Sequence, residues 1–288
     1  MNIVGLGQAG CNIAECFSQH PQYNVYKLDN GLPRAKNTYP IAKRDTHEEY
    51  DKNPLKLTQF VSRMKDSQEV LFVMAGSGAI SGASLQVLEH LHKKFDVHVL
   101  YVKPDAELLN GVGQLQERVC YRILQEYARS GVLKSMCIVS NPHMEDVLGE
   151  VPAIGYYEEL NSLLVSVLHM INIFKHTEPV IETRSALGDH VRLYTVGIVD
   201  ISSGEQKMFF PVNNSSDRCY YYGIGNQDLK TDGKLFKKIK SQVKSFSNEG
   251  EYGVSYSIHS TEYKENFAYC SEHSSKIQFF PEKALTYD

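Results

Sequence analysis

Short apolar runs and amphipathic stretches alternate along the first half of the chain. The runs are rich in Val, Ile, Leu and Phe and cover residues 2–6, 24–28, 70–74, 97–102 and 135–139. Between them, apolar residues recur with helical spacing at about residues 10–18, 55–64, 84–93 and 114–130. Because each run is apolar at successive positions, the pattern predicts parallel strands with helices on both faces of the sheet.

The second half begins with a long helical pattern over residues 156–175, which we expect to act as a central helix. Further strand-like runs follow at 191–201, 207–212, 220–224, 253–258 and 267–270, with one basic helix at 235–246. The predicted fold class is therefore α/β, with a parallel-sheet domain joined by a long central helix to a smaller α+β domain. The expected bounds are 1–155, 156–176 and 177–288.

Composition narrows the class of protein. The 288 residues are 42% hydrophobic and 22% charged, with a formal net charge of -4, which is typical of a globular protein and does not favour a polyanionic partner. No apolar run approaches the roughly 20 residues that cross a bilayer, and the first residues lack a cationic leader. The six cysteines have no metal-site spacing, so we expect reduced thiols, no metal site and a cytoplasmic location, in the host cytoplasm if the protein is viral.

A glycine-rich turn follows the first predicted strand. Residues 5–10 fit G-x-G-x-x-G between a strand and a helix, where backbone amides and the helix N-terminus bind phosphate. Asp29, near the end of the next predicted strand, is where a dinucleotide-binding fold places its ribose-binding acid. An NAD-dependent enzyme is therefore one alternative, and a tight turn without a ligand is another.

A second glycine-rich turn at residues 75–84 also follows a buried strand and precedes a helix. Two such turns suit a nucleoside di- or triphosphate that lies across the ends of parallel strands, although a close strand-to-helix contact is the alternative. The candidate phosphate-binding residues are Gly7, Gln8, Ala9, Gly10, Cys11 and Asn12 in the first turn and Gly76, Ser77, Gly78, Ala79, Ile80, Ser81 and Gly82 in the second.

These turns resemble the phosphate loops of the tubulin/FtsZ superfamily of GTPases. Residues 7–13, G-Q-A-G-C-N-I, are similar to the tubulin loop G-Q-A-G-V-Q-I, with the Asn that FtsZ uses at the last polar position. The second turn matches the register of the signature G-G-G-T-G-[ST]-G but has Ala79 in place of Thr and Ile80 in place of Gly. A hydroxyl and a flexible position are thus missing, which favours an alternative in which the pocket persists without turnover.

The resemblance extends downstream of the glycine turns. The strand at 97–102 ends in Lys103-Pro104, as the corresponding FtsZ strand does, so Pro104, Asp105 and Glu107 are expected beside a ribose, unless this is an ordinary solvated loop. Asn141 corresponds to the Asn that contacts guanine, although Ser-Asn-Pro after a strand is also a common turn.

The helix beginning Y-Y-E-E-L-N-S-L-L is similar to the tubulin helix Y-T-N-L-N-R-L-I. Tyr157 and Asn161 lie four residues apart, on one helical face, so a ring can stack on a purine while an amide reads the guanine edge. The resemblance thus implies GTP or GDP as cofactor, with Mg²⁺ bound through the phosphates.

The resemblance also implies that subunits stack head to tail and that acids after the central helix orient the attacking water on the neighbour's nucleotide. Glu182 and Asp189 are the catalytic candidates, and Glu178 is a third acid in the same segment. The family pattern is not intact, because Ser185 occupies the position at which the pattern has its second acid. Ordinary solvated carboxylates remain the alternative.

The function that we expect is a GTP-binding protein that assembles with itself into cytoplasmic filaments, with hydrolysis at the subunit contact. Its shortness and the absence of a long tail favour divergent plasmid and phage tubulins, which suggests positioning of DNA or another cargo through a DNA-bound adaptor. The alternatives are a non-polymerising or inactive nucleotide-binding homologue and an NAD-dependent enzyme. The lysines of residues 230–244 are expected on a solvated helix face, with contact to DNA or an acidic partner as the alternative.

Overall fold

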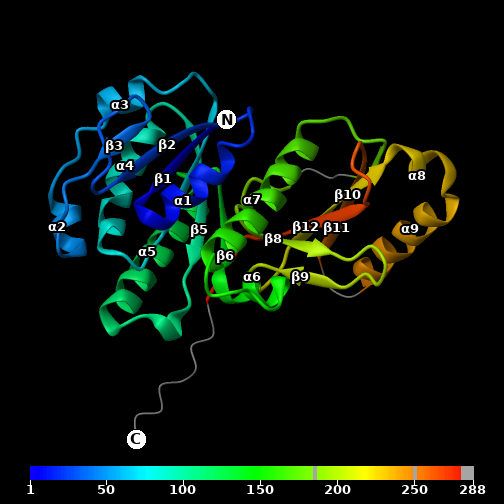
Figure 1. Cartoon of the computed structure of the whole chain (residues 1–288). Helices are drawn as coiled ribbons and strands as arrows, with labels where there is room; N and C mark the ends of the chain where they lie inside the picture. Colours follow the sequence, from blue (N-terminus) through cyan, green and yellow to red (C-terminus); the bar gives the residue numbers. More distant parts are fainter. Residues whose placement is uncertain (184–186, 249–251, 280–288) are drawn as a thin grey trace, which may run out of the picture.

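The computed structural model describes residues 1–183, 187–248 and 252–279. Within these ranges, twelve strands form a single sheet that runs through both halves of the molecule (Figure 1). Its order is β3-β2-β1-β4-β5-β6-β8-β12-β10-β11-β7, and β9 pairs with β8 outside this path. The strands are β1 Asn2–Leu6, β2 Asn24–Asp29, β3 Thr38–Pro40, β4 Glu69–Ala75, β5 Asp96–Lys103, β6 Ser135–Ser140, β7 Ile181–Glu182, β8 Leu193–Val199, β9 Gln206–Met208, β10 Asp217–Gly225, β11 Gly253–Thr261 and β12 Phe267–Ser274.

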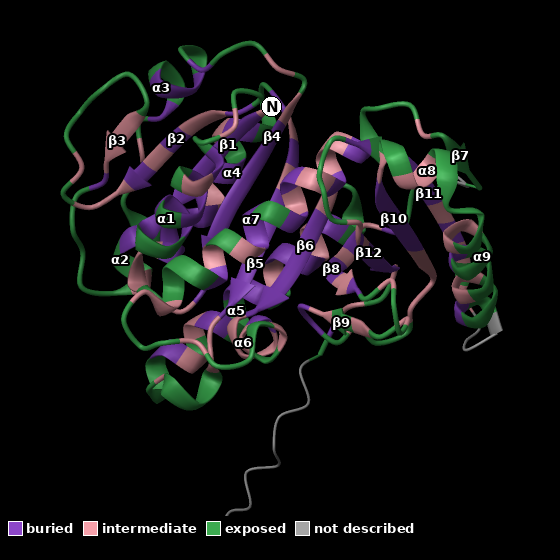
Figure 2. Cartoon of the chain, turned by 45° about the vertical axis from the view of Figure 1, so that its right-hand side comes forward, coloured by how far each residue is buried: buried purple, intermediate pink, exposed green. Residues whose placement is uncertain are grey.

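Helices cover both faces of the parallel part of the sheet. The α-helices are α1 Gly7–Phe17, α2 His47–Lys52, α3 Thr58–Ser62, α4 Ser84–His92, α5 Gly111–Ser130, α6 Asn141–Leu148, α7 Tyr156–Lys175, α8 Asn226–Thr231 and α9 Gly233–Asn248. Two short 3₁₀ helices, η1 Ala79–Ala83 and η2 Ala106–Leu108, follow β4 and β5. Figure 2 shows buried strands at the centre of the first half, with the exposed residues of the helices turned outward.

The core explains why the strands are apolar at successive positions. In β4, Phe72 and Met74 contact a cluster that includes α3, α4 and α5, whereas Leu71 and Val73 contact α1, α6 and α7 on the opposite face. Alternate side chains of a strand point to opposite faces, so a strand between two helical layers must be apolar throughout. A third cluster lies between α9 and the strands β10, β11 and β12.

The predicted fold class is confirmed: the chain is α/β, with a large and mostly parallel sheet. The central helix is present as α7, which ends at Lys175. The residue bounds of the two domains stay a prediction, because β6 and β8 pair directly and the sheet continues from one half into the other. None of the helices in the described part of the chain is long and apolar enough to cross a membrane.

Several boundaries differ from the expectation. The first helix begins at Gly7 rather than at residue 10, and the helix after β5 begins at Gly111 rather than at residue 114. The helix expected over 55–64 is reduced to the five residues of α3. The pattern also missed α2, β3, α6 and α8, which are all short.

Candidate functional site

Four neighbouring parallel strands bring the sequence-predicted residues to one edge of the sheet. β1, β4, β5 and β6 are adjacent, and their registers align Gly5 with Val73, Ala75 with Val102, and Lys103 with Ser140. The segments that follow these strands therefore emerge side by side. This is the edge at which open α/β sheets bind ligands.

The first glycine loop, residues 5–12, owes its shape to close backbone contacts. Gly7 has φ of +69°, a conformation that favours glycine. A Cβ at Gly5 would lie 2.3 Å from the Gly10 carbonyl oxygen, and a Cβ at Gly10 would lie 2.3 Å from the Val73 carbonyl oxygen. These contacts let α1 begin directly on top of β1 and β4.

The N-terminus of α1 is open to an anion. Leu6 precedes the helix without a capping side chain, and the first turn contains no acidic residue. Gln8, Ala9 and Asn12 are exposed. Cys11 instead points inward, where its thiol donates to the carbonyl oxygens of Gly5 and Leu28, and burial raises its pKa to about 12. The amides and partial positive charge of the first turn therefore remain available to a phosphate.

The second glycine loop, residues 75–84, is held against the structure below it. A Cβ at Gly76 would lie 2.0 Å from the Tyr101 hydroxyl oxygen, and a Cβ at Gly82 would lie 2.1 Å from the His47 carbonyl oxygen. Gly78 has open space around it. Gly76 and Gly82 are thus required by packing, and Gly78 and the half-exposed Ser77 face outward.

Ser81 supports the loop from within. Its buried hydroxyl donates to the Gly76 carbonyl oxygen at 2.9 Å and accepts from the Cys120 thiol at 3.4 Å. The Cys120 sulfur lies in turn 3.4 Å from Nε2 of His47. The sequence placed Ser81 among the phosphate-binding side chains, but its hydroxyl is engaged inside the loop.

The two glycine loops meet at Ile80. Its Cγ2 atom lies only 2.8 Å from where a Cβ of Gly7 would be, and both Ala79 and Ile80 pack against the core cluster of α3, α4 and α5. The position at which the family signature has glycine is therefore filled by a branched side chain.

A buried ionic cluster lies beneath the second loop, and sequence reasoning missed it. Lys103 forms an ion pair with Glu117, and its Nζ atom lies 3.8 Å from the centroid of the Tyr121 ring. The Tyr101 hydroxyl also donates to Glu117, at 3.3 Å, and burial raises the pKa of Tyr101 well above its ordinary value. One signal was visible: Glu117 shares the buried face of α5 with Cys120, Tyr121 and Leu124.

The segment after β5 turns through η2. Pro104 is half-buried, and the Asp105 carboxylate accepts from the backbone N–H of Glu107 at 2.9 Å. Glu107 itself is exposed. Asp105 therefore caps a turn, and Glu107 projects from it.

Helices α6 and α7 begin next to this segment. Asn141 is the first residue of α6 rather than part of a simple turn, and the Tyr156 hydroxyl donates to Glu145 of α6 at 2.6 Å. Tyr157 is 57% exposed, with its ring centroid 5.1 Å from that of Tyr156. Asn161 is half-exposed one turn further along α7.

Four amide side chains at this site make no hydrogen bond within the part of the chain that the structure describes. They are Gln8, Asn12, Asn141 and Asn161, which come from α1, α6 and α7 and are all exposed or half-exposed. Amides provide both donors and acceptors, so these groups can recognise the polar edge of a base or a ribose.

The predicted catalytic acids follow the opposite end of α7, whose 20 residues make it roughly 30 Å long. Glu182 does not lie in a loop: it is in β7, paired with Ser257 of β11 at the far edge of the sheet. Glu178, Glu182 and Asp189 are exposed, and Ser185 lies outside the described residues. In one subunit, the acids and the glycine loops therefore adjoin opposite ends of the central helix.

Asp29, the acid of the NAD alternative, ends β2 beside the first glycine loop. Its carboxylate accepts from the backbone N–H of Asn30 at 2.7 Å, and burial raises its pKa. The described residues contain no cluster of three or more His, Cys, Asp or Glu side chains suited to a metal ion.

Comparison with known proteins gives matches only at the level of structure. No protein-family model and no curated protein sequence matches the chain. An empty FtsZ dimer from M. jannaschii superimposes with a TM-score of 0.69 at 9% identity, covering 95% of this chain and 87% of that one. A GTPγS-form protofilament of TubZ from Bacillus thuringiensis serovar israelensis superimposes with a TM-score of 0.67 at 15% identity. The match covers 94% of this chain and 85% of that one. A four-stranded TubZ-Bt filament model superimposes with a TM-score of 0.72 at 14% identity. The match covers 94% of this chain and 85% of that one.

These matches extend over nearly the whole chain, including α7 and the mixed sheet beyond it, so they do not arise from the first half of the chain alone. The protein has the fold of the tubulin/FtsZ superfamily.

Proposed function

We propose that this protein binds GTP or GDP at the edge formed by β1, β4, β5 and β6. The observation that carries the proposal is the convergence there of an uncapped helix N-terminus, an outward-facing glycine turn and four amides that lack hydrogen-bond partners in the described chain. The helix N-terminus provides partial positive charge for a phosphate, and the four amides provide polar groups for a base. The TubZ protofilament to which the chain is similar is described as a GTPγS form.

In this proposal the phosphates lie on residues 7–12 and 76–80, and the ribose lies near Pro104 and Glu107. Asn141 and Asn161 contact guanine, with the Tyr157 ring against its face. Neither glycine loop contains a carboxylate, so Mg²⁺ is held through the phosphates rather than by a protein cage.

Calorimetry with GDP, GTPγS and NAD tests this assignment. Asn161→Ala is expected to weaken guanine nucleotide binding by about 1–3 kcal/mol, because polar groups of the base lose their partners. Ser166→Ala, an exposed position on the same helix, is the matched control and should bind as the parent does. Binding of NAD without binding of GDP would instead support the dinucleotide alternative, in which Asp29 contacts the ribose.

We further propose head-to-tail assembly into filaments in the cytoplasm. The nucleotide edge and the exposed acids adjoin opposite ends of α7, so only a second subunit can bring them together. Such a heterologous contact does not close on itself and therefore extends into a polymer. The expected result is GTP-dependent light scattering with filaments visible by electron microscopy. A protein that stays monomeric at high concentration with saturating GTP would contradict it.

The most detailed part of the proposal is GTP hydrolysis at that contact between subunits. Glu182→Ala is expected to slow GTP turnover on assembled polymer while leaving nucleotide affinity unchanged, because its role exists only in the transition state. Asp189→Ala is the second test, and Glu178→Ala is the control. If only Glu178→Ala abolishes turnover, the register of this segment is wrong. Positioning of DNA or cargo by such filaments rests on likeness of fold alone.

A homologue that keeps the pocket but has lost turnover is the second candidate. Two observations favour it: Ile80 lies between the glycine loops, and the Ser81 hydroxyl is engaged within its own loop. Nucleotide binding without measurable hydrolysis on assembled polymer would favour this candidate over an active GTPase.

A further inference from the structure

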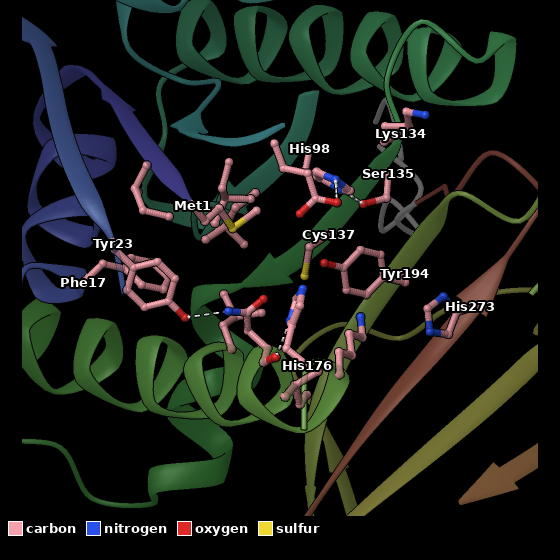
Figure 3. A pocket seen from close by; sticks show the side chains of 18 of the residues that line it. Met1, Phe17, Tyr23, His98, Lys134, Ser135, Cys137, His176, Tyr194 and His273 are labelled. Atoms are coloured by element: carbon pink, nitrogen blue, oxygen red, sulfur yellow. Dashed lines mark hydrogen bonds and ion pairs between the residues drawn. The ribbon is translucent and has the colours of Figure 1, made fainter. Parts of the chain in front are cut away.

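A cavity of about 310 Å³ lies between the sheet and the C-terminal half of α7, away from the glycine loops (Figure 3). Its floor includes Ile3, Leu71 and Cys137, near the amino ends of β1, β4 and β6, and its roof includes Leu168 and Ile171 of α7. A space of this size holds roughly ten water molecules, and it is in the range of small-molecule sites. The cavity is partly open to solvent, so a small molecule can enter it.

The two ends of the cavity differ in character. Met1, Phe17 and Tyr23 lie on one side in Figure 3, where the wall is mostly apolar. On the other side lie Tyr194 and His273, whose rings stack 5.2 Å apart. Burial lowers the pKa of His273 to about 3, and burial raises that of Tyr194 well above its ordinary value, so both are neutral hydrogen-bonding groups at neutral pH.

Of the two lysines that line the cavity, Lys175 alone forms no ion pair within 4 Å among the described residues. The Lys134 ammonium lies 3.3 Å from a carboxylate oxygen of Asp96. A carboxylate oxygen of Glu69 lies 3.6 Å from Nε2 of His98, which carries a charge only when it is protonated. The Lys175 ammonium instead lies 5.6 Å from the centroid of the Tyr194 ring, and its charge acts on Glu69, Cys137 and His273, on three different strands. Lys175 is exposed, and its ammonium lies on the Tyr194 side of the cavity.

We propose that this cavity binds a small monocarboxylic acid, with the carboxylate at Lys175 and the apolar body between α7, Phe17 and the sheet floor. The Lys175 ammonium attracts the carboxylate, and the neutral Tyr194 and His273 supply hydrogen bonds to its remaining electron pairs. The site is separate from the glycine loops and does not depend on nucleotide binding. Leu187 and Val191 also line it, so a ligand contacts the segment that contains Asp189.

Isothermal titration calorimetry on the full chain tests the proposal with octanoate and phenylacetate, which distinguish aliphatic from aromatic acids. At least one of the two acids is expected to bind saturably at one site. Octanol and octylamine, which lack a carboxylate, are expected to bind at least tenfold more weakly. Lys175→Gln should weaken acid binding at least tenfold. Lys134→Gln, whose ammonium is already paired with Asp96, is the matched control and should change affinity less than twofold.

Leu168→Trp is a second variant, because a larger side chain in the roof fills the cavity and should abolish binding in a protein whose unfolding midpoint is unchanged. Absence of saturable binding by both acids overturns the proposal. So does octanol binding as tightly as octanoate, or acid binding that survives Lys175→Gln undiminished.

Discussion

At the scale of single residues, the glycines of the two loops differ in what their missing side chains allow. Gly5, Gly10, Gly76 and Gly82 are glycines because backbone or ring atoms occupy the space where a Cβ would be. Gly78 has nothing around it, so packing does not explain it. If the proposed nucleotide site is correct, close approach of a ligand to the backbone explains a glycine at that position.

This difference gives a prediction. Gly10→Ala should lower the free energy of unfolding by about 1–3 kcal/mol, because its Cβ would lie 2.3 Å from a backbone oxygen that cannot move freely. Gly78→Ala should leave stability unchanged or raise it by about 0.4–1 kcal/mol, since its φ of -84° suits alanine. Urea unfolding measures both. Equal destabilisation by the two substitutions would contradict this account of the loops.

Ile80 gives a second prediction at this scale. If the proposed nucleotide site is correct, Ile80→Gly removes the side chain between the two loops and should raise affinity for GTPγS more than for GDP, by roughly tenfold. Titration of both nucleotides measures the ratio. An equal change for both would show that Ile80 does not contact the terminal phosphate region.

The sequence predicted individual site residues unevenly, for physical reasons. The glycine loops were recognisable because several backbone constraints fall close together in the chain. The roles of Ser81, Lys103 and Glu117 were not, because each depends on a partner from another element, such as Cys120 or Tyr101. Contacts of this kind leave only a weak trace in a single sequence.

At the scale of elements, the long periodic segments were predicted well and the short ones were not. β4 and α7 follow their expected ranges within a few residues because their apolar pattern is set by a large buried face. α6 and α8 have eight and six residues, too few for a period to be visible. The position of β7 depends on pairing with β11, about 75 residues later, which no local pattern reveals.

Pairing between β10 and β12 also carries a testable ion pair. Arg218 and Glu272 are directly opposite, and two guanidinium nitrogens lie 2.7 and 3.0 Å from one carboxylate oxygen of the buried Glu272. Glu272→Ala is expected to lower the free energy of unfolding by about 3 kcal/mol, because it leaves a partly buried charge without its partner. Arg218→Met combined with Glu272→Met should recover most of that loss. Chemical denaturation of the two variants measures it, and a double variant no more stable than Glu272→Ala would contradict this account of the pair.

His273 of β12 makes stability depend on pH. Burial lowers its pKa from 6.5 to about 3, so the unfolded chain takes up a proton below about pH 6.5 that the folded chain does not. The contribution of His273 to the free energy of unfolding is thus complete above about pH 6.5. It is lost as the pH falls toward the folded pKa, by about 1.4 kcal/mol per pH unit. Unfolding of the parent and of His273→Gln at about pH 7.5 and about pH 5 should show the smaller loss in the variant. Equal losses would exclude His273 as the source.

At the scale of the whole molecule, the division into two domains stays a prediction, and one buried core cluster joins the two halves. One apolar cluster contains Ile13 of α1 and Leu164 of α7 together with Val196 of β8 and Tyr221 of β10. Local periodicity shows where each strand lies but not that β6 and β8 are neighbours. The continuity of the sheet was therefore not predictable from the pattern.

Because one cluster spans both halves, we expect thermal unfolding to be a single transition. Leu164→Ala, at a fully buried position on α7, should lower the unfolding midpoint of the whole molecule and cost about 2–5 kcal/mol. Calorimetry measures the number of transitions. Two separate transitions, only one of which shifts in the variant, would show that the halves unfold independently.

The junction between β6 and β8 has a mechanical consequence. In the part of the chain that the structure describes, two residue pairs join these strands, Met136 with Leu193 and Cys137 with Tyr194, and the second pair also forms part of the cavity wall. A torque applied to one half of the molecule is therefore carried in part by α7 and in part by this short seam. Because Cys137 and Tyr194 belong to both, we expect twisting at the seam to change the dimensions of the cavity. A ligand of fixed shape would resist that twist and stiffen the molecule against bending.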